Sequence, residues 1–220
     1  MKIRTFIKGI MAGICISLGG WLFINCKANM ENGLLIGSLY FSIGLILICN
    51  LNYFLYTGKV CFIFERDDNT KLKKILELII GLLGNIVGTI IMGLIFRVVL
   101  NELSLSTKTI VDVIGQTKEE MSILKMLICS FFCGMFVYFA VKGYKIFNNI
   151  IMKNLSIVVC ISAFIISGFE HCIANMFYLS ISFSFSIKSI LNFFICIVGN
   201  SLGGICIPLI SNVLKDKNNS

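Results

Sequence analysis

The sequence predicts an all-α integral membrane protein with six transmembrane helices, built as two inverted three-helix repeats with broken second and fifth helices. Three observations predict this fold. Hydrophobic residues make up 57% of the 220 positions and charged residues only 14%, whereas a soluble domain carries about 25% charged residues. Six apolar stretches reach the length of about 20 residues that a helix needs to cross a bilayer. Finally, the two halves of the chain share a Gly-Asn pattern at a constant spacing.

The spans are predicted at residues 5–26, 33–64, 75–101, 122–148, 153–183 and 188–214. The first is expected to be a retained span and not a signal peptide, because its apolar run is long and no A-x-A cleavage site follows. The second and fifth are too long for one straight helix. Each has a polar interruption, "CNLNYFLYTGK" (49–59) in the second and "SGFEHCIAN" (167–175) in the fifth.

Basic residues predict the orientation, since cytoplasmic loops are enriched in Lys and Arg. Twelve basic residues lie at one end of the predicted spans. Those before the first span are Lys2, Arg4 and Lys8, and those between the second and third spans are Arg66, Lys71, Lys73 and Lys74. Those around the join of the fourth and fifth spans are Lys142, Lys145 and Lys153, and those after the sixth are Lys215 and Lys217. We therefore expect both termini in the cytoplasm, with 102–121 as an outer loop. The frequent Ile, Lys and Asn suggest an AT-rich bacterial genome, so the expected location is the bacterial inner (plasma) membrane. The net charge of +8 is spread over short loops, so it does not indicate nucleic-acid binding.

An internal repeat supports the inverted arrangement. "LGNIVGTIIMGLI" (83–95) resembles "VGNSLGGICIPLI" (198–210), which places Asn85 on Asn200 at an offset of 115 residues. The same offset places Gly19 on Gly134 and the break near Thr57 on the break near Cys172. We therefore expect a single channel domain over 1–220, with repeats at about 1–101 and 116–214.

The composition argues against metal and enzyme chemistry. The ten cysteines lie almost entirely in apolar stretches and form no C-x-x-C pair, so we interpret them as small hydrophobic residues and expect no metal and no cofactor. The sequence has no H-E-x-x-H, no plausibly placed G-x-S-x-G and no intramembrane aspartate pair, so an enzyme is not expected.

Polar residues inside the fifth span are the main functional signal. "SGFEHCIANMFYL" (167–179) contains Glu170, Asn175 and the only histidine of the chain, His171. An ionisable side chain deep in a span is costly and indicates a functional site. Taken alone, His171 could equally be a neutral core histidine.

These segments resemble the formate/nitrite transporter family, pentameric channels for small weak-acid anions with an aquaporin-like protomer. "GFEHCIANMF" resembles the fifth-helix signature of the family, and "FSIGLIL…FLYTGK" resembles its second helix and pore loop. The similarity runs from about residue 4 onward. Because the chain begins just before the first span, the amphipathic N-terminal helix of the family is not expected.

The resemblance implies a pore with His171 as the central histidine, Thr57 as the loop threonine and Lys118 in an outer vestibule, where it would attract the anion. It also implies two constrictions of the pore. Phe41 and Phe164 would form the outer constriction, near the level of His171, and the inner constriction would be formed by Leu45, Tyr56 and Val137. The sequence departs from the family pattern at three positions. Tyr56 stands where the family usually has a phenylalanine in the inner constriction, and Phe54 stands where it usually has an acidic residue before the loop threonine. Gly134 stands where the family has an asparagine in the fourth helix.

Four polar residues are expected to support this pore. Glu170 would cap freed backbone N–H groups or hold the broken helix, and Asn175 would order the same loop. Asn85 and Asn200 would bond to the opposite broken segments.

The resulting hypothesis is a channel or transporter for formate, nitrite, hydrosulfide or a similar anion, acting in the lipid bilayer as a homopentamer. Desolvation raises the basicity of a carboxylate, so the substrate could take a proton near His171 and cross as the neutral acid, or it could cross intact. The alternative is a water- or glycerol-like channel, but the paired Asn-Pro-Ala loops of that class are absent. A purely structural membrane subunit would not need two polar breaks.

Overall fold

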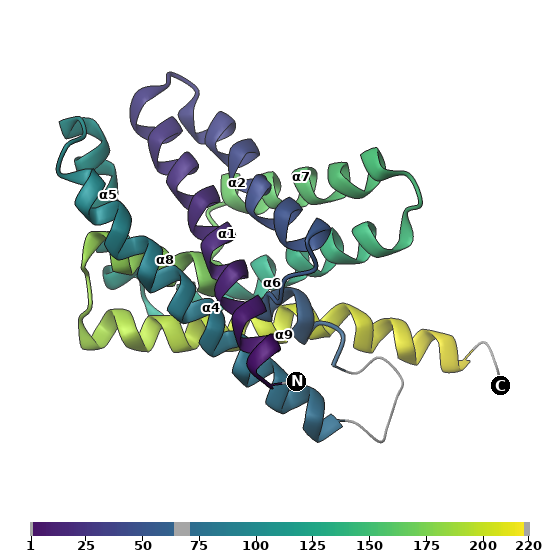
Figure 1. Cartoon of the computed structure of the whole chain (residues 1–220). Coiled ribbons are helices and arrows are strands. Elements are labelled where there is room, and N and C mark those ends of the chain that lie inside the picture. The colour runs from purple at the N-terminus through teal and green to yellow at the C-terminus, as the bar shows by residue number, and fades with distance from the viewer. Residues whose placement is uncertain (1, 64–70, 218–220) are drawn as a thin grey trace.

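A computed structural model describes residues 2–63 and 71–217. Within this part the chain forms nine α-helices and no strand (Figure 1). Their bounds are α1 Lys2–Asn29, α2 Gly33–Asn50, α3 Tyr56–Val60, α4 Lys71–Leu100, α5 Leu105–Glu120, α6 Ile123–Ile146, α7 Ile150–Ile166, α8 Cys172–Ser182 and α9 Ile187–Lys217.

Six spans with a broken second and fifth are confirmed. Five helices of the described part, α1, α2, α4, α6 and α9, are long and apolar enough to cross a membrane. The remaining span, the fifth along the chain, consists of the shorter apolar helices α7 and α8 in succession, separated by residues 167–171. The second span breaks at residues 51–55, between α2 and α3. The predicted end of this span at residue 64 and the basic Arg66 lie outside the described residues.

The prediction that 102–121 is only a loop is wrong, because most of this stretch forms the amphipathic helix α5. Its buried residues follow helical spacing: Thr107, Val111, Ile114 and Gly115. This pattern is present in the sequence, but a search for membrane-length apolar runs does not detect a polar helix. The helix packs against α1, α8 and α9, so it covers one end of the bundle.

Glycines allow the long helices to pack in two matching pairs, α1 with α4 and α6 with α9. A Cβ atom on Gly13 would clash with the backbone oxygen of Asn85, and one on Gly134 would clash with the backbone oxygen of Asn200. Gly13 is thus the counterpart of Gly134, and the predicted match of Gly19 to Gly134 is wrong. Gly19 instead lies against the backbone of Phe41 in α2.

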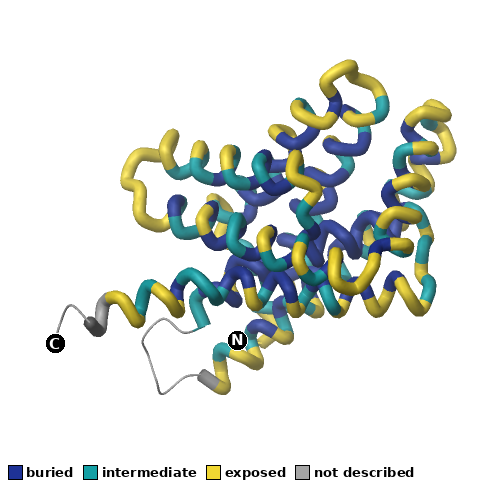
Figure 2. The backbone as a smooth tube through the Cα atoms, turned by 180° about the vertical axis from the view of Figure 1, so that it is seen from behind, coloured by how far each residue is buried: buried dark blue, intermediate teal, exposed yellow. Residues whose placement is uncertain are grey.

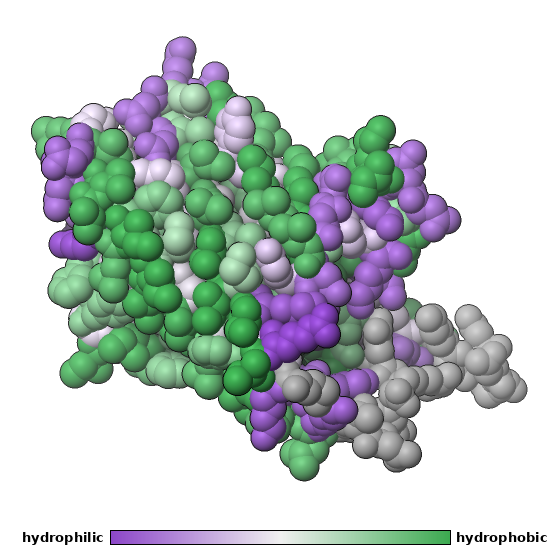
Figure 3. All heavy atoms as spheres, viewed as in Figure 1, coloured by the Kyte–Doolittle hydropathy of each residue, from purple (hydrophilic) through white to green (hydrophobic). Residues whose placement is uncertain are grey.

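The surface suits a lipid environment. Buried residues gather where the helices cross, whereas the turns at the helix ends are exposed (Figure 2). Apolar side chains cover much of the face seen in Figure 3, and hydrophilic ones gather toward its edges. Along α4 and α9 many large apolar residues are exposed, among them Ile79, Leu83, Ile91, Phe194, Val198 and Leu202. A broad exposed apolar surface on long helices is typical of contact with lipid or with other membrane subunits.

Candidate functional site

The two breaks bring Thr57 and His171 together in the middle of the protein. Thr57 lies in the first turn of α3 and His171 is the N-cap of α8. The distance from Thr57 Oγ1 to His171 Nε2 is 2.8 Å, and the two residues are only 1% and 4% exposed. A hydrogen bond thus links the second and fifth spans, which are far apart in sequence.

The backbone determines the tautomer of His171. Its Nδ1 accepts a hydrogen bond from the Ala174 N–H, at 3.3 Å. A nitrogen that accepts carries no proton, so the neutral ring holds its proton on Nε2 and donates it to Thr57. The ring is also stacked on Phe164, with 6.2 Å between ring centroids. His171 is therefore held on three sides.

A small apolar cavity adjoins this histidine. Its volume is about 10 Å³, close to the lower limit for a single water molecule. Phe41 and Phe164 meet edge to face across it, with 6.4 Å between centroids. The other residues of its lining are Ile16, Leu45, Leu55, Val137, Ile161 and His171.

Tyr56 does not line this cavity, contrary to the role implied by the resemblance. Its hydroxyl lies 2.8 Å from Ser201 Oγ in α9, which turns the ring away from the cavity. Leu55, the residue before it, takes the position in the lining. Because α3 begins at Tyr56, the rotation of this short helix decides which of the two neighbours faces the cavity.

On one side the cavity opens into a wider recess of about 360 Å³, here called the Lys118 hollow. His171, Phe41 and Phe164 lie at its base, since they line both spaces. Its charged lining residues are Lys27, Lys118, Lys125 and Glu170. A recess with more cations than anions raises the local concentration of anions.

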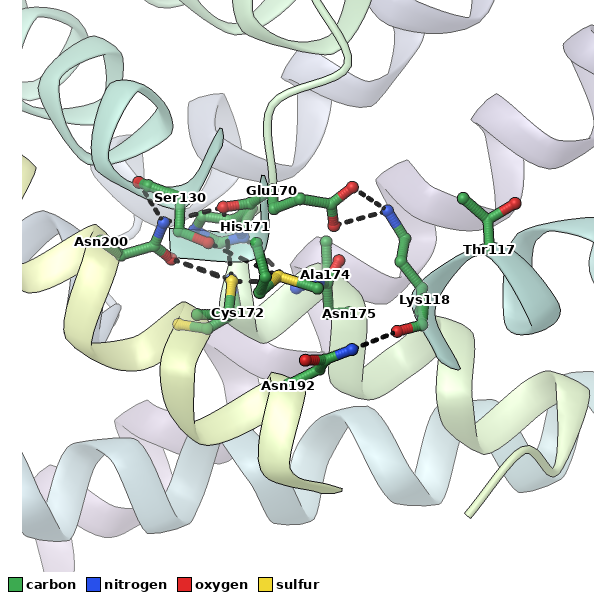
Figure 4. A network of polar contacts seen from close by, with 12 residues as sticks. Thr117, Lys118, Ser130, Glu170, His171, Cys172, Ala174, Asn175, Asn192 and Asn200 are labelled. Carbon is green, nitrogen blue, oxygen red and sulfur yellow. Dashed lines mark hydrogen bonds and ion pairs between the residues drawn. The ribbon is translucent and has the colours of Figure 1, made fainter. Parts of the chain in front are cut away.

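Lys118 and Glu170 form an ion pair inside this hollow. Lys118 Nζ lies 2.6 Å from both carboxylate oxygens of Glu170 (Figure 4). The glutamate was expected either to cap freed backbone N–H groups or to hold the broken helix, and within the described residues its carboxylate bonds Lys118 and makes no bond to a backbone N–H. The carboxylate instead ties the break of the fifth span to the last turn of α5.

The freed backbone groups are held by two asparagines in equivalent ways. Asn85 accepts from the Tyr56 N–H at 2.9 Å and donates to the Phe54 oxygen at 2.7 Å. Asn200 accepts from the Cys172 N–H at 2.8 Å and donates to the Glu170 oxygen at 2.8 Å. Each asparagine therefore holds the break of its own half, and the expected bonding to the opposite segments is wrong.

Asn175 lies one turn after His171 in α8 and lines the Lys118 hollow. Its backbone N–H donates to the His171 oxygen at 2.8 Å, and its side chain donates to Cys196 Sγ at 3.6 Å. It thereby joins α8 to α9.

On the other side of the constriction lies a recess of about 160 Å³, here called the Lys59 pocket. Leu45 and Leu55 line both this pocket and the central cavity, so the constriction separates two recesses. Lys59 and Lys145 supply the positive charge of the pocket. All ten cysteines are free thiols. The described residues contain no group of three or more His, Cys, Asp or Glu that could hold a metal ion.

Sequence reasoning missed three residues that shape the site: Leu55, Ser201 and Asn192. Asn192 in α9 is 1% exposed and donates to the carbonyl of Lys118 at 3.1 Å (Figure 4). It also donates to the carbonyl of Met121 at 2.9 Å. It holds the end of the helix that carries Lys118. A polar residue in the apolar run of α9 was a visible signal, but its partners could not be inferred before α5 was known.

The family model described as Formate/nitrite transporter matches residues 2–213. The chain belongs to the formate/nitrite transporter family. Two curated relatives of this membrane protein are similar in sequence. Formate channel FocA of Haemophilus influenzae is 27% identical over 182 residues, covering 79% of this chain and 64% of the relative. Formate channel FocB of Escherichia coli is 21% identical over 185 residues, covering 80% and 65%. The chain therefore spans just under two thirds of the length of either relative.

Two solved structures share the fold of this family member. One, titled as a pentameric formate channel with formate bound, has a TM-score of 0.86 and 21% identity, covering 97% of this chain and 96% of the other. The second, titled as an FNT family ion channel, has a TM-score of 0.80 and 22% identity, with coverages of 92% and 86%. At these identities the likeness shows the fold.

Proposed function

We propose that the chain is a channel or transporter for small monovalent anions of weak acids, such as formate, nitrite and hydrosulfide. One observation carries the proposal: the buried contact between His171 and Thr57 adjoins a narrow apolar cavity that separates two lysine-bearing recesses. Membership of the formate/nitrite transporter family supports the same function. We propose that the solute crosses without being chemically converted into another compound, so the protein is not an enzyme.

The path runs from the Lys118 hollow past Phe41 and Phe164 to His171. An anion that enters the apolar constriction loses water, and a bare charge there is very costly. The hydroxyl of Thr57 and the Nε2–H of His171 offer hydrogen bonds at this point. The N-terminus of α8, which begins next to His171, adds a positive partial charge that favours an anion.

We propose that the anion gains a proton from the solution in the hollow and crosses as the neutral acid. The loss of water raises the basicity of the anion, so it binds the proton more strongly as it reaches the constriction. His171 acts here as a neutral donor, because a second proton on Nδ1 would displace the bond from the Ala174 N–H. The bond to Ala174 supports this scheme over one in which a charged imidazole escorts the intact anion.

The remaining residues have supporting roles in this proposal. The walls of the constriction exclude water, and the ion pair of Lys118 with Glu170, together with Asn175, orders the entrance to the pore. Asn85 and Asn200 fix the two breaks. The wall residues are Phe41, Phe164, Leu45, Leu55 and Val137.

We further propose that the protein works in the inner membrane of a bacterium with both termini in the cytoplasm, as a homopentamer. The clustering of basic residues in the expected cytoplasmic loops supports the orientation. The solved structure with a TM-score of 0.86 is described as a pentameric formate channel, and its similar fold supports the assembly.

Uptake into proteoliposomes tests the function. Vesicles with and without the protein are mixed with formate, nitrite or hydrosulfide over a series of pH values, with glycerol as the neutral solute. We expect each anion to enter faster than into empty vesicles, and the rate to rise as the pH falls, because each anion crosses with a proton. Accelerated glycerol entry with no accelerated anion entry at any pH would show a neutral-solute channel instead.

A further inference from the structure

We propose that Lys27 and Lys125, and not Lys118, collect the anion at the mouth of the Lys118 hollow. This inference rests on the transport function proposed above and assigns the binding residues for the small monovalent anion before it enters the constriction. Neither lysine was singled out by the sequence.

Lys118 is poorly suited to collect a free anion because its charge is already matched. Its Nζ lies 2.6 Å from both oxygens of Glu170, and the glutamate is only 3% exposed. A bidentate pair of opposite charges acts at a distance as a dipole and not as a net charge. An arriving anion would have to compete with a carboxylate held in place by the fold.

Lys27 and Lys125 line the same hollow and are exposed. Within residues 2–63 and 71–217, neither lies within salt-bridge distance of a carboxylate, and Glu170 is the only acidic residue in the lining. The Nζ of Lys27 lies 5.8 Å from the ring centroid of Phe23, a contact that leaves its charge available. The hollow thus holds three lysines against one glutamate, and the excess charge lies on Lys27 and Lys125.

The position of Lys125 supports a role outside helix stability. It lies in the first turn of α6, which begins at Ile123. The N-terminal end of a helix carries a positive partial charge, so a cation there is unfavourable. Lys27, in the last turn of α1, is favourably placed for its own helix. The unfavourable interaction of Lys125 with its own helix is explained if its charge attracts anions into the hollow that it lines.

The exposed ammonium groups of Lys27 and Lys125 are suited to weak, reversible binding of an anion that is about to enter the constriction. Each is strongly hydrated, so a monovalent anion is attracted and released easily, as conduction requires. The expected ligand is any small monovalent anion, and the discrimination between anions happens deeper, at the constriction.

The experiment compares charge removal at three places while formate uptake into proteoliposomes is measured against formate concentration and ionic strength. The K27M/K125M variant should raise the half-saturating concentration by about three- to tenfold at low salt and flatten the dependence on ionic strength. K108M/K188M removes the same charge from residues outside the lining of the hollow and should behave as wild type. The K27R/K125R variant retains both charges and should also keep the wild-type salt dependence.

The K118M/E170Q variant decides between the two sources of charge. It replaces the ion pair by neutral side chains of similar length and leaves the net charge of the hollow unchanged. Its maximal rate is expected to fall, because the break loses its tie to α5, but its salt dependence should remain that of wild type. The inference is overturned if K118M/E170Q flattens the salt dependence while K27M/K125M retains it. A wild-type protein that carries no anion at all would instead refute the transport function, and this inference with it.

Discussion

At the scale of single residues, the pore depends on how His171 is bonded. Its Nδ1 accepts from the Ala174 N–H and its Nε2 faces Thr57 at 2.8 Å. One ring thus serves as the cap of a helix and as a hydrogen-bond donor in the pore. These two tasks can be separated by substitution.

The His171→Asn variant is expected to fold and to keep the pH dependence of uptake, but to transport at a lower rate. Asparagine is among the best N-cap residues, so its side-chain oxygen can replace Nδ1 as the acceptor for the Ala174 N–H. The anion takes its proton from the solution, so uptake of formate measured between about pH 5 and 8 should still rise on acidification. The rate should fall because the Nε2–H donor in the constriction is lost. A Thr57→Ser variant, which keeps the hydroxyl, is the control. A pH-independent uptake by H171N would show that the imidazole itself carries the proton, contrary to the proposed scheme.

Asn192 provides a second prediction at this scale. The Asn192→Leu variant leaves the carbonyls of Lys118 and Met121 without their buried donor, which should lower the free energy of unfolding by about 1–3 kcal/mol. Thermal unfolding in detergent measures the change. Asn25→Ala, which removes only a bond to Trp21 within its own helix, is the control and should change stability far less. Equal losses in the two variants would show that Asn192 does not anchor the end of α5.

The identity of the pore residues was only partly predictable. His171 stood out because a lone imidazole in an apolar stretch is costly. The sequence could not show that Leu55, and not Tyr56, lines the cavity. The two residues are adjacent, and the rotation of α3 about its axis, fixed by the bond from the Tyr56 N–H to Asn85, determines which one faces inward. The ion pair of Lys118 with Glu170 was equally hidden, since it requires Lys118 to lie on a helix.

At the scale of elements, the two breaks are fixed by matching asparagines on α4 and α9. Asn85 also donates to the Gly9 oxygen in α1, and Asn200 to the Ser130 oxygen in α6, both at 2.8 Å. Each asparagine therefore joins three elements of its own half. Such a buried and fully bonded amide replaces the helical hydrogen bonds that the break removes.

Replacing either asparagine by alanine should destabilise the protein by a similar amount. The variants N85A and N200A each lose at least three side-chain hydrogen bonds, so we expect at least about 1–3 kcal/mol from unsatisfied groups. The free energy of unfolding in detergent is the measurement, and Asn148→Ala, at an exposed position, is the control. Markedly unequal losses would contradict the equivalence of the two halves.

The pattern of spans was predictable because apolar length and charge are written directly in the sequence. The equivalence of Gly13 with Gly134 was not, because both repeats contain several glycines and only the backbone contact with the asparagine selects the right one. The helix α5 was missed although its apolar residues follow helical spacing, because it is too polar to be found as a span.

At the scale of the whole molecule, the described residues leave many apolar side chains of α4 and α9 uncovered. Neighbouring chains of the proposed homopentamer would cover part of this surface, so we expect the purified protein to run as an assembly of five chains. Native mass spectrometry in mild detergent measures the number directly. A protein that remains a single chain and still transports formate would show that the pore needs no partner.

The two halves of the molecule meet at a cavity of only about 10 Å³. Protons move through proteins by hopping along unbroken files of water, and a space that holds one molecule at most cannot contain such a file. The resting protein should therefore be electrically tight. A cell could keep many copies of it in an energised membrane without draining its proton-motive force.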